Sequence, residues 1–298
     1  MEKFLDCWLV ISHVNYGNRY FAIIKRLDCS ACGLFSDYIV YLGCINYFLN
    51  KGFIPIIDLQ SFKNIYNGYN ISKTFDNPWE YFFYQPFGYS LNIVKKKFKN
   101  IKYFQCKIDI FRPNISIFFN KILNNYWHNI SKNYASVKKN ILYEANKIII
   151  NLFKDSKNIL GILMRGTDYI ARKPKGHPIP PTPSMVIKDI KEINTKNKYD
   201  WFFISTEDDL IRDIFIKEFG YKIKYLISKK INYDYNKKLF LSENIKGNIQ
   251  YIKIYLLNMI ILSKCIDIIS SQTSGAIGVF ILSEGFRYSK VYNLGTYF

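Results

Sequence analysis

Acidic residues and histidines are scarce in this chain of 298 residues. Lysine and arginine number 42 against 23 aspartates and glutamates, which gives a formal net charge of +19. A surplus of this size favours anionic partners, such as a nucleotide, a nucleic acid or an anionic membrane surface. The histidines are scattered, and the single Cys-x-x-Cys pair, Cys29 and Cys32, has no second pair that would complete a zinc site. The sequence therefore gives little support for a tetrahedral zinc site.

Long apolar runs are also missing. The longest candidate for a membrane span, residues 251–270, is interrupted by Lys253, Lys264 and Asp267, whereas a span needs about 20 mostly apolar residues. The first 19 residues lack the apolar segment of a secretory signal. We expect a cytoplasmic protein with buried, reduced cysteines. The positive charge leaves open a peripheral contact with an anionic inner membrane.

What the chain does contain is typical of a globular α/β protein. Hydrophobic residues make up 49% and charged residues 22%, which supplies a substantial core and excludes disorder. Apolar runs predict strands, and segments with helical periodicity alternate with them, as in a doubly wound parallel sheet. The predicted strands are 53–58, 158–164, 201–205, 221–227 and 265–269, and the predicted helices are 38–49, most of 115–153, 184–194, a segment ending at 219, 248–263 and a last helix after 274.

Three polar clusters follow predicted strands directly, where ligands bind in open parallel sheets. They are Arg165-Gly166-Thr167-Asp168, Thr206-Glu207-Asp208-Asp209 and Ser270-Ser271-Gln272-Thr273-Ser274. Hydroxyls and free amides at a helix start suit a phosphate, and an arginine can add a charge-assisted contact. The carboxylates suit ribose hydroxyls or a base. The clusters thus fit a nucleoside-diphosphate site without a Walker loop, although helix capping and a structural ion pair would explain them equally well.

The same clusters resemble motifs of the fucosyltransferase superfamily. Gly161-Ile-Leu-Met-Arg-Gly-Thr-Asp168, followed by His177-Pro-Ile179, is similar to the HVRRTD and HPI motifs of α1,6-fucosyltransferases. Phe203-Ile-Ser-Thr-Glu-Asp208 is similar to their YLATDD, and Ser270-Ser-Gln272 matches their SSQ. Cys32-Gly-Leu-Phe-Ser-Asp37 resembles the Gly-Leu-Gly-Asn opening of other fucosyltransferases.

The resemblance implies a GT-B-like fold with two Rossmann-like domains. We place an acceptor-side domain at 1–155 and a nucleotide-sugar donor domain at 156–298. Arg165 occupies the position of the arginine that binds the donor β-phosphate. The other residues that we assign to donor binding are Gly33, Gly166, Thr167, His177, Thr206, Glu207, Asp208, Ser270, Ser271, Gln272, Thr273 and Ser274.

This chain departs from the family pattern at three positions. Leu163 replaces the motif histidine that contacts guanine, Gly166 replaces a second arginine, and Lys173 replaces the glutamate proposed as catalytic base. The resemblance makes GDP-fucose the expected donor, and these departures leave another NDP-hexose or heptose as the alternative.

The function expected from this resemblance is that of an inverting, metal-independent glycosyltransferase of bacterial surface polysaccharide synthesis. Arg165, Asp168 and Asp37 are the catalytic candidates, with Asp168 as the first choice of base and Asp37 as the second. A hydrogen bond that fixes its own loop is an equal alternative for Asp168. For His177, stabilisation of a Pro-rich turn is favoured over a ligand contact. The acceptor would be a glycan or a lipid-linked saccharide, and no cofactor is expected.

Two other classes of protein compete with this assignment. A non-catalytic nucleotide- or sugar-binding protein would keep the phosphate site without transferring a sugar. A nucleic-acid-binding protein would explain the charge, but the lysines are dispersed and no RNP, KH or helix-turn-helix signature is present. We therefore expect no nucleic-acid partner.

Overall fold

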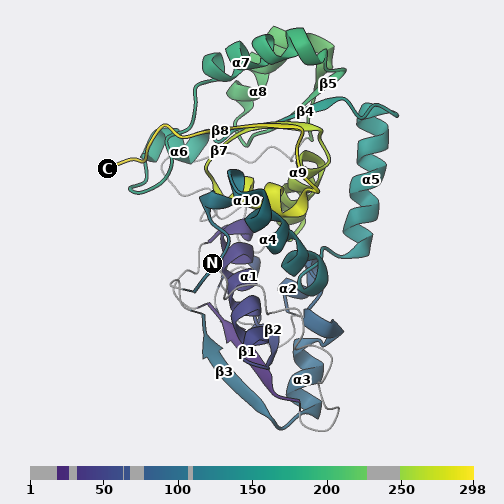
Figure 1. Cartoon of the computed structure of the whole chain (residues 1–298), viewed down its shortest axis with the longest axis vertical. Helices are drawn as coiled ribbons and strands as arrows, with labels where there is room; N and C mark the ends of the chain where they lie inside the picture. Colours follow the sequence, from purple (N-terminus) through teal and green to yellow (C-terminus); the bar gives the residue numbers. More distant parts are fainter. Residues whose placement is uncertain (1–18, 27–31, 63, 68–76, 107–109, 227–248) are drawn as a thin grey trace.

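The computed structural model of the protein describes residues 19–26, 32–62, 64–67, 77–106, 110–226 and 249–298, and for Thr167 and Asp168 it describes the backbone only. Two parallel sheets lie in opposite halves of the elongated molecule, with helices α1 (Leu34–Asn50), α4 (Lys121–Tyr134) and α10 (Ser274–Leu282) between them (Figure 1). This arrangement confirms the predicted α/β fold class. The division into domains at residue 155 stays a prediction, although the change of sheet does fall between residues 105 and 159.

The smaller sheet is built from the first third of the chain. Its described strands have the order β2-β1-β3, with β1 (Phe21–Lys25), β2 (Ile54–Ile57) and β3 (Ile101–Gln105) all parallel. Helix α1 (Leu34–Asn50) connects β1 to β2, as the sequence predicts for 38–49 and 53–58. The sequence analysis missed β1 and β3. No residue of β3 is buried and the strand lacks a continuous apolar run, so its pattern gave little signal.

The larger sheet has the order β6-β5-β4-β7-β8 in the described residues, and all its pairs are parallel. Side chains of β4 alternate between two cores: Leu160 and Ile162 pack toward helices α7 and α8, and Ile159 and Leu163 pack toward the core that contains α9 and α10. The sheet is therefore covered on both faces, as the doubly wound prediction requires. Its elements are β4 (Ile159–Leu163), α6 (Thr167–Arg172), α7 (Pro183–Asn197), β5 (Trp201–Ser205), α8 (Asp209–Phe219), β6 (Ile223–Lys224), α9 (Ile249–Ser263), β7 (Asp267–Ser271), α10 (Ser274–Leu282) and β8 (Tyr288–Tyr292).

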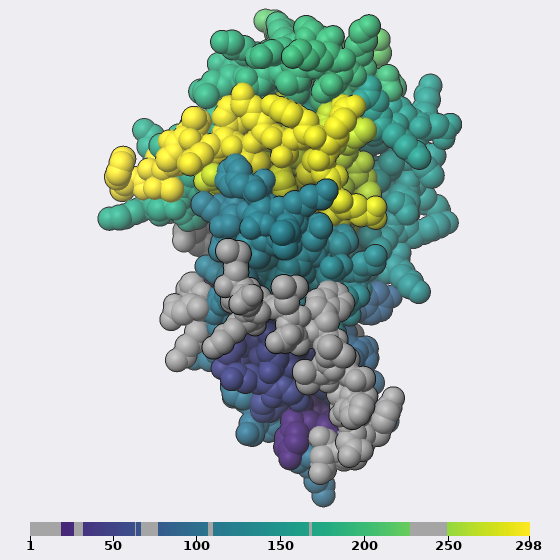
Figure 2. Space-filling model, in the orientation of Figure 1, coloured from purple at the N-terminus to yellow at the C-terminus, as the bar shows by residue number. Residues whose placement is uncertain are grey.

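Of the remaining described helices, α3 (Leu91–Lys97) packs on the smaller sheet through Leu91 and Val94 (Figure 1). The others are α2 (Trp79–Phe82), α4 (Lys121–Tyr134) and α5 (Lys139–Phe153), with short 3-10 turns at Ile65–Asn67, Pro86–Gly88, Ile115–Phe118 and Gly220–Lys222. Figure 2 shows the C-terminal residues, in yellow, crossing the upper half of one face of the molecule, with green residues above them and blue-teal residues below. None of the helices in these ranges combines the length and the apolar character that a bilayer crossing requires.

Helix α10 joins the two halves into one core. All residues from Gly275 to Ile281 are buried, and the helix packs against α1, α4 and α9. The approach to α1 is so close that a Cβ added to Gly278 would lie 2.0 Å from the Phe35 ring. Apolar residues of α1, α4, α9 and α10 accordingly form one continuous hydrophobic cluster.

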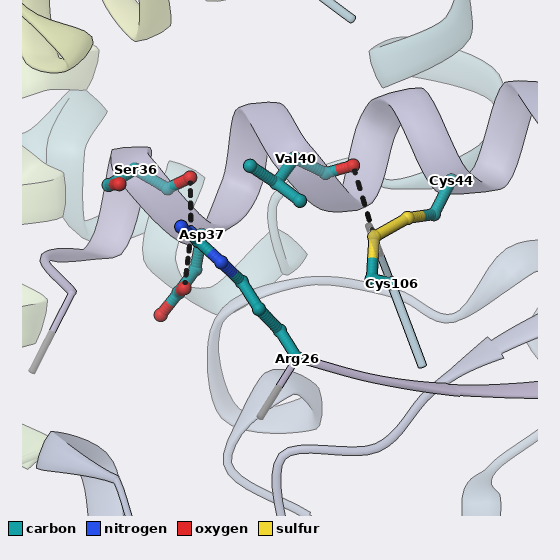
Figure 3. Close-up of a disulfide and its surroundings, with 6 residues drawn as sticks. All are labelled: Arg26, Ser36, Asp37, Val40, Cys44 and Cys106. Carbon is teal, nitrogen blue, oxygen red and sulfur yellow. Dashed lines mark hydrogen bonds and ion pairs between the residues drawn. A yellow bond between two sulfur atoms is a disulfide. The ribbon is translucent and has the colours of Figure 1, made fainter. Parts of the chain in front are cut away.

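The expectation of reduced cysteines is wrong for part of the chain. Cys44, on the buried face of α1, forms a disulfide with Cys106, which follows β3 (Figure 3). Cys32 is also disulfide-bonded. Cys44 and Cys106 are 62 positions apart in sequence, so only the packing of α1 on the sheet brings their Cα atoms to 6.5 Å. Among the described residues Cys265 is a free, buried thiol. Because disulfides persist mainly in oxidising compartments, this bond weighs against the cytoplasmic location, which stays a prediction.

The contact between α1 and α10 yields a test of how the halves are held together. We expect Gly278→Ala to lower the free energy of unfolding by about 1–3 kcal/mol through overpacking, although alanine is intrinsically the better helix former by about 1 kcal/mol. Chemical denaturation measures the loss. A second substitution in the same chain, Phe35→Leu, should recover part of it by giving the new methyl group room. Unchanged stability of Gly278→Ala would contradict the close packing of these helices.

Candidate active site

A cavity of about 600 Å³ lies where the two halves meet. Its wall combines the N-terminus of α1, the loop after β4, the end of β5, one side of α9 and the N-terminus of α10. Strands β4, β5 and β7 are neighbours in the sheet and parallel, so their carboxyl ends open toward the same space. This is the place at which the polar clusters were predicted to meet.

Arg165 lines the cavity and is held from two sides. Its Nε atom lies 3.4 Å from Glu207 Oε1, and its guanidinium lies 4.6 Å from the centre of the Tyr169 ring. The same Glu207 oxygen accepts a hydrogen bond from the backbone amide of Gly166 at 3.0 Å. Glu207 therefore positions both the arginine and the loop that carries it, and cation–π contact with Tyr169 restricts the guanidinium further.

The N-terminus of α10 supplies a second feature of the wall. Thr273 caps the helix, with its hydroxyl accepting a hydrogen bond from Ala276 N at 3.2 Å, and Ser274 and Gly275 follow in the lining. The backbone amides of Ser274 and Gly275 make no hydrogen bond within the part of the chain that the structure describes. Free amides and the positive end of the helix dipole together make a binding place for an anion.

The predicted pyrophosphate segment divides between wall and core. Thr273 and Ser274 line the cavity, whereas Ser270, Ser271 and Gln272 are not in the lining. Ser270 and Ser271 belong to β7, where each is only 1% exposed. The residues that reach the cavity are those at the start of α10, which follow the Ser-Ser-Gln motif directly.

The cluster after β5 divides in the same way. Thr206 and Glu207 line the cavity. Asp208 does not; it is 9% exposed and its Oδ1 accepts hydrogen bonds from Leu210 N and Ile211 N as the N-cap of α8. Helix capping is therefore the observed role of Asp208.

The loop after β4 contains Gly166 and the start of α6. A Cβ at Gly166 would lie 2.5 Å from the Asp208 side chain, so a larger residue, such as the second arginine of the family motif, does not fit here without a shift. Thr167 and Asp168 lie in the first turn of α6, a helix that the sequence analysis missed. Their side chains are outside the described part of the structure, so the proposed role of Asp168 as base stays a prediction.

His177 lines the cavity and also stabilises its own loop. Its Nδ1 atom lies 3.0 Å from Tyr169 Oη, and its carbonyl accepts a hydrogen bond from Tyr297 N at 3.0 Å. Gly176 N in turn donates to Tyr297 O at 2.8 Å. These backbone hydrogen bonds connect the loop to the C-terminal residues, and His177 is also among the residues that line the cavity. The role of the His177 side chain in stabilising the turn stays a prediction.

Across the cavity, α1 contributes Gly33, Phe35 and Ser36, but not Asp37. Asp37 is 5% exposed, and its carboxylate accepts hydrogen bonds from Arg26 Nη1 at 3.0 Å and from Tyr66 Oη at 2.8 Å. Figure 3 shows Arg26 reaching both Asp37 and the carbonyl of Ser36. The structure does not bring Asp37 to the cavity as a base; its buried ion pair instead anchors the first turn of α1.

Several residues of the wall were missed by sequence reasoning. Tyr169, Arg172, Pro174 and Lys175 come from the segment after β4, and Tyr251, Ile254, Tyr255 and Asn258 come from α9. Those of α9 recur three or four positions apart, so they share one face of the helix. That spacing was a usable signal, but no role was predicted for this face of the helix.

The charge of the lining is mainly positive. Arg165, Arg172 and Lys175 contribute cations, and Glu207 is the carboxylate among the described lining residues. Such a wall concentrates an anionic ligand. In the described ranges, no group of three or more His, Cys, Asp and Glu side chains is arranged to hold a metal ion.

Comparison with solved structures identifies the fold. No protein-family model and no curated protein matches the chain. A NodZ α1,6-fucosyltransferase soaked with GDP-fucose matches at a TM-score of 0.53 and 14% identity, over 89% of this chain and 93% of that one. POFUT1 in complex with GDP-fucose matches at 0.55 and 10% identity, over 94% and 99%. NodZ from Bradyrhizobium, crystallised with selenomethionine, matches at 0.53 and 13%, over 89% and 93%.

The chain has the fold of these fucosyltransferases. The predicted GT-B-like fold and the resemblance to fucosyltransferases are thereby confirmed at the level of structure. Because the fucosyltransferase fold extends over nearly the whole chain, the N-terminal sheet belongs to it as well as the part that carries the motifs.

The contact between Glu207 and the Arg165 loop gives a second test. Glu207→Gln keeps the shape but removes the charge, and we expect it to weaken the hydrogen bond to Gly166 N by about 1–3 kcal/mol. Amide exchange measured for residues 160–170 should accelerate. The matched control is Glu218→Gln on α8, which removes the acidic partner of Lys191 and should leave the exchange rates of residues 160–170 unchanged. Unaltered protection at Gly166 in Glu207→Gln would contradict the positioning role.

Proposed function

We propose that the protein is a glycosyltransferase that moves a sugar from a nucleoside-diphosphate sugar, with GDP-fucose as first choice, to a hydroxyl group of a glycan. One observation carries this proposal: Arg165 and the N-terminus of α10 line the same cavity, next to the ends of the adjacent parallel strands β4 and β7. A guanidinium and free helix amides around one space are suited to a diphosphate. The fold of GDP-fucose-binding enzymes supports the choice of donor.

The reaction that fits these groups is a single displacement. As the bond between C1 of the sugar and the diphosphate breaks, negative charge grows on the departing diphosphate. Arg165 and the amides of Ser274 and Gly275 would stabilise that charge, which is the main task of a catalyst of this type. The acceptor oxygen attacks C1 from the opposite face, which inverts its configuration, and loses its proton to a base. Asp168 remains the first candidate for this base.

The identity of the donor depends on the residues that would contact its nucleobase. Leu163 lies in the cavity wall at the position of the motif histidine, so an apolar contact takes the place of an imidazole. Another NDP-hexose or heptose is therefore the alternative donor. A thermal-shift screen of GDP-sugars, UDP-sugars and free nucleotides separates these cases, because a ligand that binds only the folded state raises the melting temperature. Stabilisation by UDP-sugars alone would rule out GDP-fucose.

The acceptor that we propose is a glycan or a lipid-linked saccharide used in bacterial surface polysaccharide synthesis. Support comes from the resemblance to a fucosyltransferase of Bradyrhizobium. A panel of free and lipid-linked oligosaccharides, incubated with labelled donor, tests the proposal. Transfer to protein acceptors only would refute it, and binding of donor without any transfer would favour the non-catalytic alternative.

Arg165→Ala tests the assignment of the diphosphate site. Loss of this cation should lower kcat by about 10²–10³-fold, since the contact is strongest in the transition state. Arg165→Lys keeps the positive charge, so its kcat should fall by a smaller factor. Arg212→Ala removes an arginine of α8 that is not in the cavity lining and serves as the control. Transfer at the wild-type rate by a folded Arg165→Ala variant would refute the site.

Metal independence is tested in the same transfer assay. Since Arg165 and the α10 amides supply the positive charge, we expect EDTA to leave the rate unchanged and added Mg²⁺ or Mn²⁺ to leave it within about twofold. Activity that EDTA abolishes and Mg²⁺ or Mn²⁺ restores would contradict this part of the proposal.

A further inference from the structure

The hydroxyl of Tyr255 lies beside the first turn of α10. A Cβ added to Gly275 would be 2.7 Å from Tyr255 Oη and 3.7 Å from Thr273 Oγ1, so the phenol occupies the space that a side chain at position 275 would fill. Tyr255 comes from α9 and lines the cavity together with Thr273 and Ser274. A residue from a helix outside the motifs thus reaches the predicted anion site.

The position of the phenol is fixed by packing. Its ring lies edge-on to Phe35, with 5.9 Å between ring centroids and an interplanar angle of 72°. Phe35 in turn is clamped against Gly278 of α10. Helices α1, α9 and α10 therefore hold the hydroxyl in place before any ligand arrives, which is the preorganisation that efficient charge stabilisation requires.

The hydroxyl of Tyr255 is a protonated donor for which the described residues provide no acceptor. Among the described residues, no hydrogen bond is made by Tyr255 Oη. Burial raises the pKa of the phenol to about 12, while the nearby Arg165 lowers it and Glu207 raises it. Polar groups in protein interiors normally have hydrogen-bonding partners, so a preorganised donor on a cavity wall points to a ligand atom.

We propose that Tyr255 donates a hydrogen bond to the diphosphate of the bound donor, as a third ligand beside Arg165 and the amides of Ser274 and Gly275. This inference rests on the proposed function and adds a residue that the motifs do not contain. The phenol keeps its proton throughout, and its hydrogen bond strengthens as negative charge builds on the phosphate oxygen. It therefore stabilises the transition state more than the bound donor.

Tyr255→Phe tests the role, since it keeps the ring against Phe35 and removes only the hydroxyl. A hydrogen bond to a charged group is worth a factor of about 10–100, so we expect kcat to fall by that factor. Calorimetry should show weaker binding of both GDP and inorganic pyrophosphate, with an unchanged melting temperature. Tyr143→Phe, at an exposed position of α5, is the matched control and should change none of these.

A second variant tests the geometry. Gly275→Ala places a methyl group where the phenol oxygen lies and should also weaken pyrophosphate binding. In the Tyr255→Phe background, Gly275→Ala should cause a smaller loss of pyrophosphate affinity, because the oxygen that the methyl group displaces is already absent. Strictly additive losses would count against the inference.

The remaining outcomes separate this inference from the proposed function. Wild-type kcat and affinities in Tyr255→Phe overturn the inference alone. A loss of affinity for GDP but not for pyrophosphate also overturns it, because the phenol would then contact the nucleoside. If the wild-type chain transfers no sugar from any nucleotide donor, the proposed function fails, and pyrophosphate binding by Tyr255→Phe and wild type still decides the role of the phenol.

Discussion

The burial of helix α10 between the two sheets is the constraint on which the rest of the structure depends. An apolar helix that is covered on every side must be packed by both halves of the chain, and Gly278 allows α1 to approach it closely. The same packing fixes where the helix begins. Its N-terminus therefore opens into the cavity at the junction, and the free amides of Ser274 and Gly275 cannot move away from it. Stability and the anion site thus share one element.

The charged groups of the site are arranged so that most of them support one another. Glu207 connects the end of β5 to the loop after β4 and directs Arg165, and Tyr169 packs against the guanidinium and contacts His177. The carboxylate of Glu207 partly neutralises the positive charge of Arg165. A diphosphate carries two formal negative charges and Glu207 carries one, so the arginine still attracts the diphosphate. The other cations of the wall strengthen this attraction.

Sequence reasoning was most successful where the pattern was local. The buried strands 158–164 and 201–205, the helix caps and the three polar clusters could be predicted from short stretches, because strand burial and capping leave a signal within a few residues. It was least successful for β1, β3 and β8, whose apolar pattern is short or half exposed, and for the cysteines. Cys44 and Cys106 are distant in sequence, and no local signal announces that they pair.

The sequence by itself determined that this is a parallel α/β protein with an arginine and a hydroxyl-rich helix start after neighbouring strands. Only the tertiary structure decided which of the candidates face the cavity. Asp37 is buried in an ion pair with Arg26, and Asp208 caps α8. Tyr255 of α9 lies beside the start of α10. The physical reason is that a local pattern fixes the conformation of a segment, whereas the direction in which a side chain points in space depends on what packs behind it.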